Sequence, residues 1–436
     1  MLEKYKQVSS RSHELWNRAC KLFPGGISHN LRTFGLDRCG AYPPYMKRAE
    51  GSHIWDVDNN EYVDWWMTHF SMILGHNHPK IREAIEAQLS NGYHFGALNE
   101  PQVIFGEKLR EAIPYLEKMR FTTTGSESTT YAVRLARLFT HKRLVAKVRG
   151  GWHGGNDSLG YHLMYPFSDE PFFDGATFEF NDRESVDTLL KNHGKELAAI
   201  VIEPVLGAGG GLAPKPGFLP YLREETEKRN ILLIFDEIVT GFRLCFGSAG
   251  KDVFGVEPDL ITLGKIAAGG MPLGVYGGRE DIMALATPGA EGGRWVGGGT
   301  FASHPLSMVA GIATLETLKS LKDEYNTLNR RGDKFREEIN DFFNNEKVTV
   351  IATGIGSIVF AHWLQKDLGD SLITGGSLGA SFDHKRLDML QGMLIEQGIF
   401  GYHGLGAISF MHSDEDLQKT QEAISTVVHK IKLREG

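Results

Sequence analysis

The sequence predicts an α/β protein in which a large domain holds a mostly parallel sheet covered by helices. Two patterns carry this prediction. Between about residues 118 and 280, short apolar runs alternate with amphipathic stretches, as in repeated β-α units. On either side of that region the alternation gives way to longer helical patterns and paired strands. We therefore expect a large domain at residues 56–315 and a smaller α+β domain built from residues 1–55 and 316–436.

The first hundred residues are predicted to contain two helices separated by a strand pair. A helix is expected at residues 9–22, where a Pro-Gly-Gly sequence ends it. A strand, a turn and a second strand follow over residues 54–63. Pro79 then begins a helix with apolar residues on one side, and this helix is expected to end near Gly92.

The sheet of the large domain is predicted from short apolar runs. Its strands are expected at residues 119–121, 144–148, 198–202, 231–235, 260–263 and 274–276. After residue 305 a long helical pattern leads to strands at 348–351 and 357–360. The acidic stretch that follows Ser413 indicates the beginning of a C-terminal helix.

Composition excludes several classes of function. The 436 residues are 41% hydrophobic and 23% charged, as in an ordinary globular protein. No apolar run is long enough to cross a bilayer and the N-terminus lacks a signal core, so we expect a cytoplasmic protein without membrane contact. A net charge of −7 with scattered basic residues argues against nucleic-acid binding. The three cysteines are not paired in spacing, and His76 and His78 have no third ligand nearby, so we expect no metal site.

Two residues at predicted strand ends indicate the chemistry. Lys265 follows an apolar strand and precedes small residues, so its amine is expected to be poorly hydrated. Desolvation lowers the pKa of an amine, and a neutral amine attacks carbonyl carbons. Asp236 ends a second apolar strand. A Schiff-base lysine and an acid that keeps a pyridine nitrogen protonated are what pyridoxal phosphate requires.

Glycine-rich turns at other strand ends supply the remaining parts of a cofactor site. Gly125 and Ser126 lie between a strand and a helix, where backbone N–H groups bind phosphate, although an ordinary capped helix has the same pattern. Trp152 lies in a loop rich in glycine and either stacks on a planar cofactor or covers the strand end. Thr300 and Glu203 also follow predicted strands or glycine turns. Ligands of open α/β sheets collect at these carboxyl ends.

The chain resembles the class III, fold type I pyridoxal phosphate-dependent aminotransferases, and within them the group around glutamate semialdehyde aminomutase. The resemblance extends from about Pro24 through the C-terminal helix. It rests on blocks in the same order along the chain: Met-Ile-Leu-Gly-His-Asn-His-Pro at 72–79, Thr-Gly-Ser-Glu at 124–127, Trp-His-Gly at 152–154, Ile-Glu-Pro at 202–204, Asp-Glu-Ile-Val-Thr-Gly-Phe-Arg at 236–243 and Leu-Gly-Lys at 263–265.

The resemblance implies a role for each residue around the cofactor ring. Lys265 would form the Schiff base with pyridoxal 5'-phosphate and move a proton between substrate and cofactor. Asp236 would pair with the pyridine N–H, while Trp152 and Ile238 would face the two sides of the ring. His153 is expected to orient the ring or the loop rather than to act as a base.

The resemblance also implies a shared active site. Gly125 and Ser126 would hold the phosphate, helped by Thr300 from a second subunit, so the active form would be a homodimer. Glu203 would lie near the cofactor and influence access by the substrate or the amino-group acceptor.

Several residues depart from the pattern of the aminomutase itself. Alignment places Gly404 where that enzyme has a glutamate, His69 where it has a tryptophan, and His29 where it has a serine. Arg32 is retained and is a candidate for binding a substrate carboxylate in a bidentate way. The alternative is a surface arginine that pairs with Asp37.

These departures favour an aminotransferase that moves an amino group from an amino acid to a 2-keto acid in two half-reactions. Glutamate-1-semialdehyde 2,1-aminomutase and an amino-acid racemase remain alternatives on the same scaffold. A dehydrogenase is disfavoured because no G-x-G-x-x-G follows the first strand of the parallel region. An aromatic, D- or β-amino acid is the expected donor. Aromatic side chains that either line its pocket or belong to the core are Trp65, Trp66, Phe70, Tyr93 and Phe95.

Overall fold

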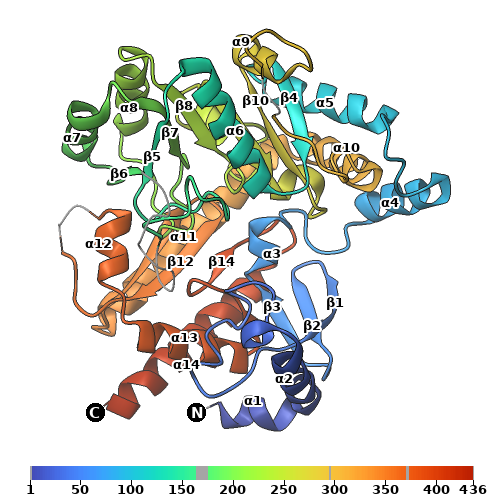
Figure 1. The fold of residues 1–436 in the computed structure, drawn as a ribbon. Coiled ribbons are helices and arrows are strands. Elements are labelled where there is room, and N and C mark those ends of the chain that lie inside the picture. The colour runs from blue at the N-terminus through green and yellow to red at the C-terminus, as the bar shows by residue number, and fades with distance from the viewer. Residues whose placement is uncertain (1, 164–174, 294–295, 370–372, 436) are drawn as a thin grey trace. The chain divides into compact units, whose positions relative to one another are not determined.

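The computed structural model describes residues 2–163, 175–293, 296–369 and 373–435, which form two compact units (Figure 1). Unit 1 consists of Met1–His78, Leu328–Asp367 and Ser381–Gly436, and unit 2 of Pro79–Thr327 and Leu368–Ala380. The divisions lie at residues 78 and 327, whereas the sequence predicted 55 and 315. The difference has a simple reason, because a boundary at residue 55 would cut a strand that pairs within the sheet of unit 1.

Unit 2 is built on a mostly parallel sheet, as predicted. Within the described residues the sheet has seven strands in the order β4-β10-β9-β8-β7-β5-β6. The pairs from β9 to β6 are parallel, and β10 is antiparallel to both of its neighbours. The strands are β4 (Lys118–Thr122), β5 (Leu144–Val148), β6 (Ala176–Phe178), β7 (Leu197–Ile202), β8 (Leu232–Asp236), β9 (Leu260–Gly264) and β10 (Gly274–Gly278).

The central strands read as continuous apolar runs because helices cover the sheet. Every residue of β7 and β8 is buried, so neither strand shows the alternation of a half-exposed strand. α6 packs along β9 and β10, and α10 packs against α4 and α5. The helices of unit 2 are α4 (Pro79–Asn91), α5 (Glu100–Ala112), α6 (Gly125–Thr140), α7 (Arg183–His193), α8 (Phe218–Glu227), α9 (Glu280–Met283), α10 (Pro305–Ser320) and α12 (Gly375–Ala380).

Unit 1 combines two small sheets with helices. One sheet has the order β1-β2-β3-β13, with β1 (Met46–Glu50), β2 (His53–Asp56), β3 (Glu61–Asp64) and β13 (Ile399–Phe400). The other has the order β11-β12-β14, with β11 (Val350–Ile355), β12 (Ile358–Trp363) and β14 (Gly406–Ala407). Its helices are α1 (Glu3–Val8), α2 (Ser10–Leu22), α3 (Met67–Phe70), most of α11 (Tyr325–Asn345), α13 (His384–Glu396) and α14 (Asp414–Glu435).

The helices and strands expected from the sequence are present, but several elements were missed, among them β1, the thirteen-residue helices α5 and α13, and the short elements α1 and β6. α1 precedes the predicted N-terminal helix and is separated from it by Ser9. β6 has three residues, which is too short for its pattern to be recognised. Across the described ranges, no helix combines the length and the apolar character needed to cross a membrane.

A buried acid fixes the chain that follows β8. Glu237 accepts hydrogen bonds from the hydroxyl of Ser248 at 2.6 Å and from the backbone N–H groups of Ala249 at 2.7 Å and Gly250 at 2.9 Å. Burial raises the pKa of Glu237 to about 7, although these hydrogen bonds oppose the rise. The side chain therefore folds residues 248–250 back against the end of the strand that carries Asp236.

We expect Glu237→Ala to lower the free energy of unfolding by about 3 kcal/mol or more, because several buried donors lose their acceptor. The midpoint of urea unfolding measures this change. Glu227→Ala is the matched control. The side chain of Glu227 is exposed and pairs with Arg223 four residues earlier at 3.1 Å, so its loss should cost less than ~1 kcal/mol. Equal effects of the two substitutions would contradict the role of Glu237.

Candidate active site

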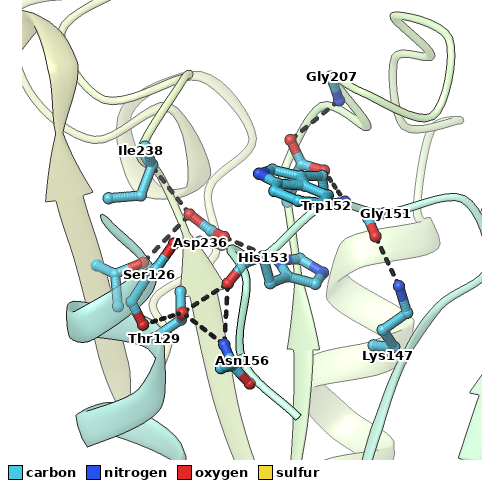
Figure 2. A network of polar contacts seen from close by, with 12 residues as sticks. Ser126, Thr129, Lys147, Gly151, Trp152, His153, Asn156, Gly207, Asp236 and Ile238 are labelled. Carbon is cyan, nitrogen blue, oxygen red and sulfur yellow. Dashed lines mark hydrogen bonds and ion pairs between the residues drawn. The ribbon is translucent and has the colours of Figure 1, made fainter. Parts of the chain in front are cut away.

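The Asp236 carboxylate is held from several sides at the end of β8. Its Oδ1 atom accepts hydrogen bonds from the backbone N–H of Ile238 at 3.1 Å and from the hydroxyl of Thr262 at 3.2 Å. Its Oδ2 atom lies 2.8 Å from Nδ1 of His153 (Figure 2). Asp236 is 4% exposed, so these donors replace the water that a carboxylate loses on burial.

His153 is buried and is positioned through both its ring and its backbone. Its carbonyl accepts hydrogen bonds from the hydroxyl of Thr129 at 2.6 Å and the side-chain amide of Asn156 at 3.2 Å. Burial lowers the pKa of His153, although Asp236 opposes this change. A neutral ring that donates from Nδ1 to Asp236 leaves Nε2 as an acceptor, and this buried atom has no hydrogen-bond partner among the described residues.

The loop that carries Trp152 and His153 lies directly on the first turn of α6. Gly154 has φ +92°, and a Cβ at this position would lie 2.4 Å from Oγ of Ser126. The next residue, Gly155, donates its backbone N–H to the same hydroxyl at 3.1 Å. The close approach requires glycine at position 154, which explains part of the glycine-rich sequence.

The beginning of α6 is suited to bind an anion. Thr124 caps the helix together with Glu127, and this arrangement satisfies the backbone N–H groups of residues 123, 124 and 127. The N–H groups of Gly125 and Ser126 donate to none of the described residues. Unpaired N–H groups and the helix dipole favour a phosphate at this position.

Lys265 begins a short helical turn directly after β9. Its φ of +45° places a non-glycine residue in the left-handed region, a strained conformation that often occurs at functional sites. Burial lowers the pKa of Lys265, and the negative charge of Asp236, joined by that of Glu203 when it is ionised, partly offsets that change. The residue as a whole is half-buried, and the direction of this shift agrees with the low hydration expected from its apolar neighbours.

Glu203 is a buried acid at the end of β7. Its Oε2 atom accepts a hydrogen bond from the backbone N–H of Gly207 at 3.1 Å, and Oε1 accepts one from Trp152 at 3.4 Å. Burial, and then the charge of Asp236, raise the pKa of Glu203 to about 8. At neutral pH its protonated form is therefore favoured.

Most of the predicted cofactor residues gather at the carboxyl ends of strands in unit 2. The ring of Trp152 is 38% exposed, although the loop around it is fixed. Ile238 is close to the beginning of α6, since a Cβ on Gly125 would lie 2.9 Å from its Cδ1 atom. Thr300 is the exception, because it is exposed and makes no hydrogen bond to Gly125 or to any other predicted cofactor residue among those described. Its action on a second subunit stays a prediction.

Unit 1 brings together two of the predicted substrate residues. The rings of His29 and His69 are 5.0 Å apart, and the ring of His69 lies 4.0 Å from that of Trp66. Met67, Thr68, His69 and Phe70 all have positive φ, between +42° and +70°. This left-handed turn fixes where the chain presents His69.

Gly404 occupies a turn of unit 1 that admits no side chain. It has φ +82°, and a Cβ would lie 2.1 Å from the carbonyl oxygen of Ala361. The same turn carries Tyr402, whose ring is 5.4 Å from Trp66. Arg32 is exposed and forms no ion pair with Asp37 or with another described residue, so the alternative pairing is absent.

The other aromatic residues considered from the sequence do not share one environment. Trp65 is fully buried and packs against Phe335 at 4.8 Å, so it belongs to the core of unit 1. Phe70 is buried as well, whereas Tyr93 and Phe95 are exposed on unit 2. Within the described ranges no cluster of His, Cys, Asp or Glu could hold a metal ion.

Sequence reasoning missed several residues that support the site. Thr129, Asn156 and Thr262 hold His153 and Asp236, but no pattern distinguishes them from ordinary polar residues. Lys147 had a visible signal, because it is a charged residue inside the apolar strand β5. Its side chain is fully buried and donates to the carbonyl of Gly151 at 2.6 Å.

The arrangement fits pyridoxal phosphate. Gly125 and Ser126 offer N–H groups for the phosphate, Asp236 offers a carboxylate oxygen for the pyridine N–H, and Lys265 offers a poorly hydrated amine. Trp152 presents a partly exposed ring from a fixed loop, as a stacking partner must.

Glu203 predicts how the stability of the cofactor-free protein depends on pH. Its pKa is about 8 in the folded protein and lower in the unfolded chain, so the folded state retains a proton that the unfolded state releases. Its contribution is complete at low pH and decreases as pH rises through about 8. We expect Glu203→Gln to flatten the decrease in free energy of unfolding between about pH 5 and 8. Glu237 contributes equally in the wild type and in Glu203→Gln. A difference in the free energy of unfolding between the two proteins that does not change with pH would contradict the expectation.

Comparison with known proteins identifies the family. The aminotransferase class-III family model matches residues 40–362. Glutamate-1-semialdehyde 2,1-aminomutase of Methanosarcina acetivorans is 38% identical over 429 residues, covering 95% of this chain and 97% of that protein. Two solved structures are each 29% identical with a TM-score of 0.87 and cover 98% of this chain. One is a β-phenylalanine aminotransferase from Variovorax paradoxus, and the match covers 95% of that chain. The other is an omega-transaminase from Sphaerobacter thermophilus, and the match covers 99% of that chain. The chain belongs to the class III aminotransferase family, which confirms the predicted fold and its pyridoxal phosphate cofactor.

Proposed function

We propose that this protein is an aminotransferase that moves an amino group from an amino acid to a 2-keto acid in two half-reactions. Membership of the class III family supports amino-group chemistry of this kind. The choice between net transfer and rearrangement within one molecule rests on the residues around the substrate.

The residues of unit 2 have separate tasks in this proposal. When bound, pyridoxal phosphate supplies an electron sink for the substrate carbon. Asp236, held by His153, would accept the pyridine N–H and keep that nitrogen positive. The lowered pKa of Lys265 favours the neutral amine, which can take a proton from one carbon and return it to another. Trp152 and Ile238 confine the ring.

Gly404 is the observation that favours net transfer. The resemblance places a glutamate of the aminomutase at this position, and a Cβ here would meet the carbonyl of Ala361 at 2.1 Å. A glutamate would therefore need a different backbone at this turn. Without that carboxylate, one anchor for a substrate with two nitrogen groups is missing, so release of the keto product is favoured.

The aminomutase is the second candidate, and a specific observation supports it. The relative from Methanosarcina acetivorans bears that name and matches nearly the whole chain at 38% identity. A third candidate, racemisation, needs only that Lys265 return the proton to the opposite face of the substrate carbon.

We propose an aromatic or β-amino acid as the donor. Trp66, His69 and His29 form a contacting group of rings in unit 1. Arg32 has a guanidinium group that can bind the carboxylate of the donor. The 29% identical enzyme from Variovorax paradoxus, described as a β-phenylalanine aminotransferase, supports this choice. A D-amino acid donor and a cytoplasmic location stay predictions.

We expect the cofactor to be linked to Lys265. Borohydride treatment of the protein with pyridoxal phosphate should fix the cofactor on that residue, detected by peptide mass. The Lys265→Ala variant should carry no covalently fixed cofactor after this treatment. Its turnover should decrease by at least about a thousandfold, because the group that moves the proton is removed. Lys251→Ala is the matched control, since Lys251 is exposed and pairs with Glu257 at 2.6 Å. Labelling in Lys265→Ala would overturn the proposal.

The same preparation distinguishes the three reactions. In the aminotransferase, a β- or aromatic amino acid should convert the cofactor to its amine form, and 2-oxoglutarate or pyruvate should restore the aldehyde absorbance. Conversion of glutamate-1-semialdehyde to its 2,1-shifted isomer without a keto acid would establish the aminomutase instead. Interconversion of D and L forms without a keto acid would establish a racemase.

We also propose that the protein forms a homodimer through an apolar surface of unit 2. The surface comprises exposed side chains from α4, α5 and the segments at residues 93–98 and 301: Leu89, Tyr93, Phe95, Leu98, Val103 and Phe301. It is continuous with the loop that carries Thr300, because Asn99 donates to the carbonyl of Ser303 at 3.0 Å. A second copy that covers this surface would also receive Thr300.

We expect Leu98→Arg to shift the protein from dimer to monomer in light scattering after size exclusion. Leu98 is 88% exposed, and a second copy that covers it could not accommodate a buried charge. Leu433→Arg provides the control, because Leu433 is 82% exposed on α14 of unit 1. A dimer that survives Leu98→Arg unchanged would contradict the assignment of this surface.

A further inference from the structure

The peptide group between Gly151 and Trp152 is held at both of its polar ends. Its carbonyl accepts a hydrogen bond from the ammonium group of Lys147 at 2.6 Å (Figure 2). Its N–H donates to Oε1 of Glu203 at 3.4 Å. A cation thus lies at the negative end of the peptide dipole and an acid at its positive end, so both contacts fix the same orientation of the peptide plane.

The plane of this peptide determines the position of the two functional side chains that follow it. Trp152 begins at its nitrogen, and the ring of His153 folds back over Gly151. A Cβ on Gly151 would lie 3.0 Å from Nε2 of His153, so a side chain at position 151 would press on the ring. A tilt of the peptide would therefore move the indole of Trp152 and the contact between His153 and Asp236 together.

Lys147 is an unusual choice for its position. It lies on β5 between apolar residues and its side chain is 0% exposed. Burial of an ammonium group is costly unless strong hydrogen bonds compensate for lost hydration. The ring of Tyr161, 5.4 Å from the ammonium, adds a cation–π contact. A methionine would fill the same space without the cost of desolvating a charge. The hydrogen bond to the carbonyl of Gly151 explains why a lysine is present instead.

We propose that Lys147 is a positioning residue for the cofactor, acting with Glu203 as a clamp on the Gly151–Trp152 peptide. This inference rests on the proposed role of Trp152 as the stacking partner of pyridoxal phosphate. In this role Lys147 acts through the peptide and not by contact with the cofactor or the substrate. It orients the indole and the ring of His153, and it therefore determines how tightly the cofactor ring is held.

The test measures cofactor binding rather than turnover. Pyridoxal phosphate is titrated into the cofactor-free protein and binding is followed by quenching of tryptophan fluorescence. We expect Lys147→Met to weaken binding by about ten- to a hundredfold, the range for loss of a charge-assisted hydrogen bond. Lys147→Gln, which keeps a neutral donor, should restore part of the affinity and should fold even if Lys147→Met does not.

Two controls separate positioning from a general effect on structure. Lys142→Met removes another lysine of unit 2 that donates to a backbone carbonyl, that of Asn230 at 3.3 Å in an exposed position, and should leave the affinity unchanged. In a Trp152→Ala background, replacement of Lys147 should cost much less affinity than in the wild type, because the ring it orients is gone.

The outcomes are distinct. Wild-type affinity in both Lys147 variants would overturn the clamp, and so would an equal loss with and without Trp152. A loss confined to the background that retains Trp152 supports it. A wild-type protein that binds no pyridoxal phosphate would overturn the proposed function and the clamp with it.

Discussion

The site depends on one buried contact, in which Nδ1 of His153 lies 2.8 Å from Oδ2 of Asp236. Asp236 ends β8 and His153 lies in the loop after β5, and β7 separates these strands in the sheet. The contact therefore bridges two strand ends across a third, and Glu203 at the end of β7 accepts a hydrogen bond from the same loop. A buried carboxylate requires hydrogen-bond donors that replace water. The requirement of Asp236 for a donor therefore positions the loop with His153 and Trp152, and through that loop the contact with Glu203.

Burial also determines the charges of the site. Loss of hydration favours the neutral form of any ionisable group, and it raises the pKa of Glu203 while it lowers that of Lys265. Burial therefore shifts both groups towards their neutral forms. The amine gains the form that reacts with carbonyl carbons through the same effect.

Much of the site could be predicted because its parts are local in sequence. An apolar run that leads to Asp236 or Lys265 predicts both the strand and the place of that side chain at the carboxyl end of the strand. The supporting contacts could not be predicted, since they depend on how strands are ordered: the clamp joins Lys147 of β5 to Glu203 of β7 through one peptide. The unit boundary near residue 78 depends likewise on β13, a strand from the far end of the chain that pairs with β3.

The left-handed turn at Met67–Phe70 could not be predicted from the sequence, because it contains no glycine. Each non-glycine residue in this conformation costs roughly 1–2 kcal/mol, so the turn must be held by its surroundings. Asp64 accepts from the N–H of Met67 at 3.0 Å, and the carbonyl of Thr68 accepts from the hydroxyl of Ser71 at 2.7 Å. Asp64 is itself anchored, with Oδ2 2.7 Å from His76. A chain that needed only to connect β3 to the next segment could use relaxed backbone. Strained backbone of this kind often occurs where the position of a side chain matters, and here the turn places the ring of His69 4.0 Å from that of Trp66.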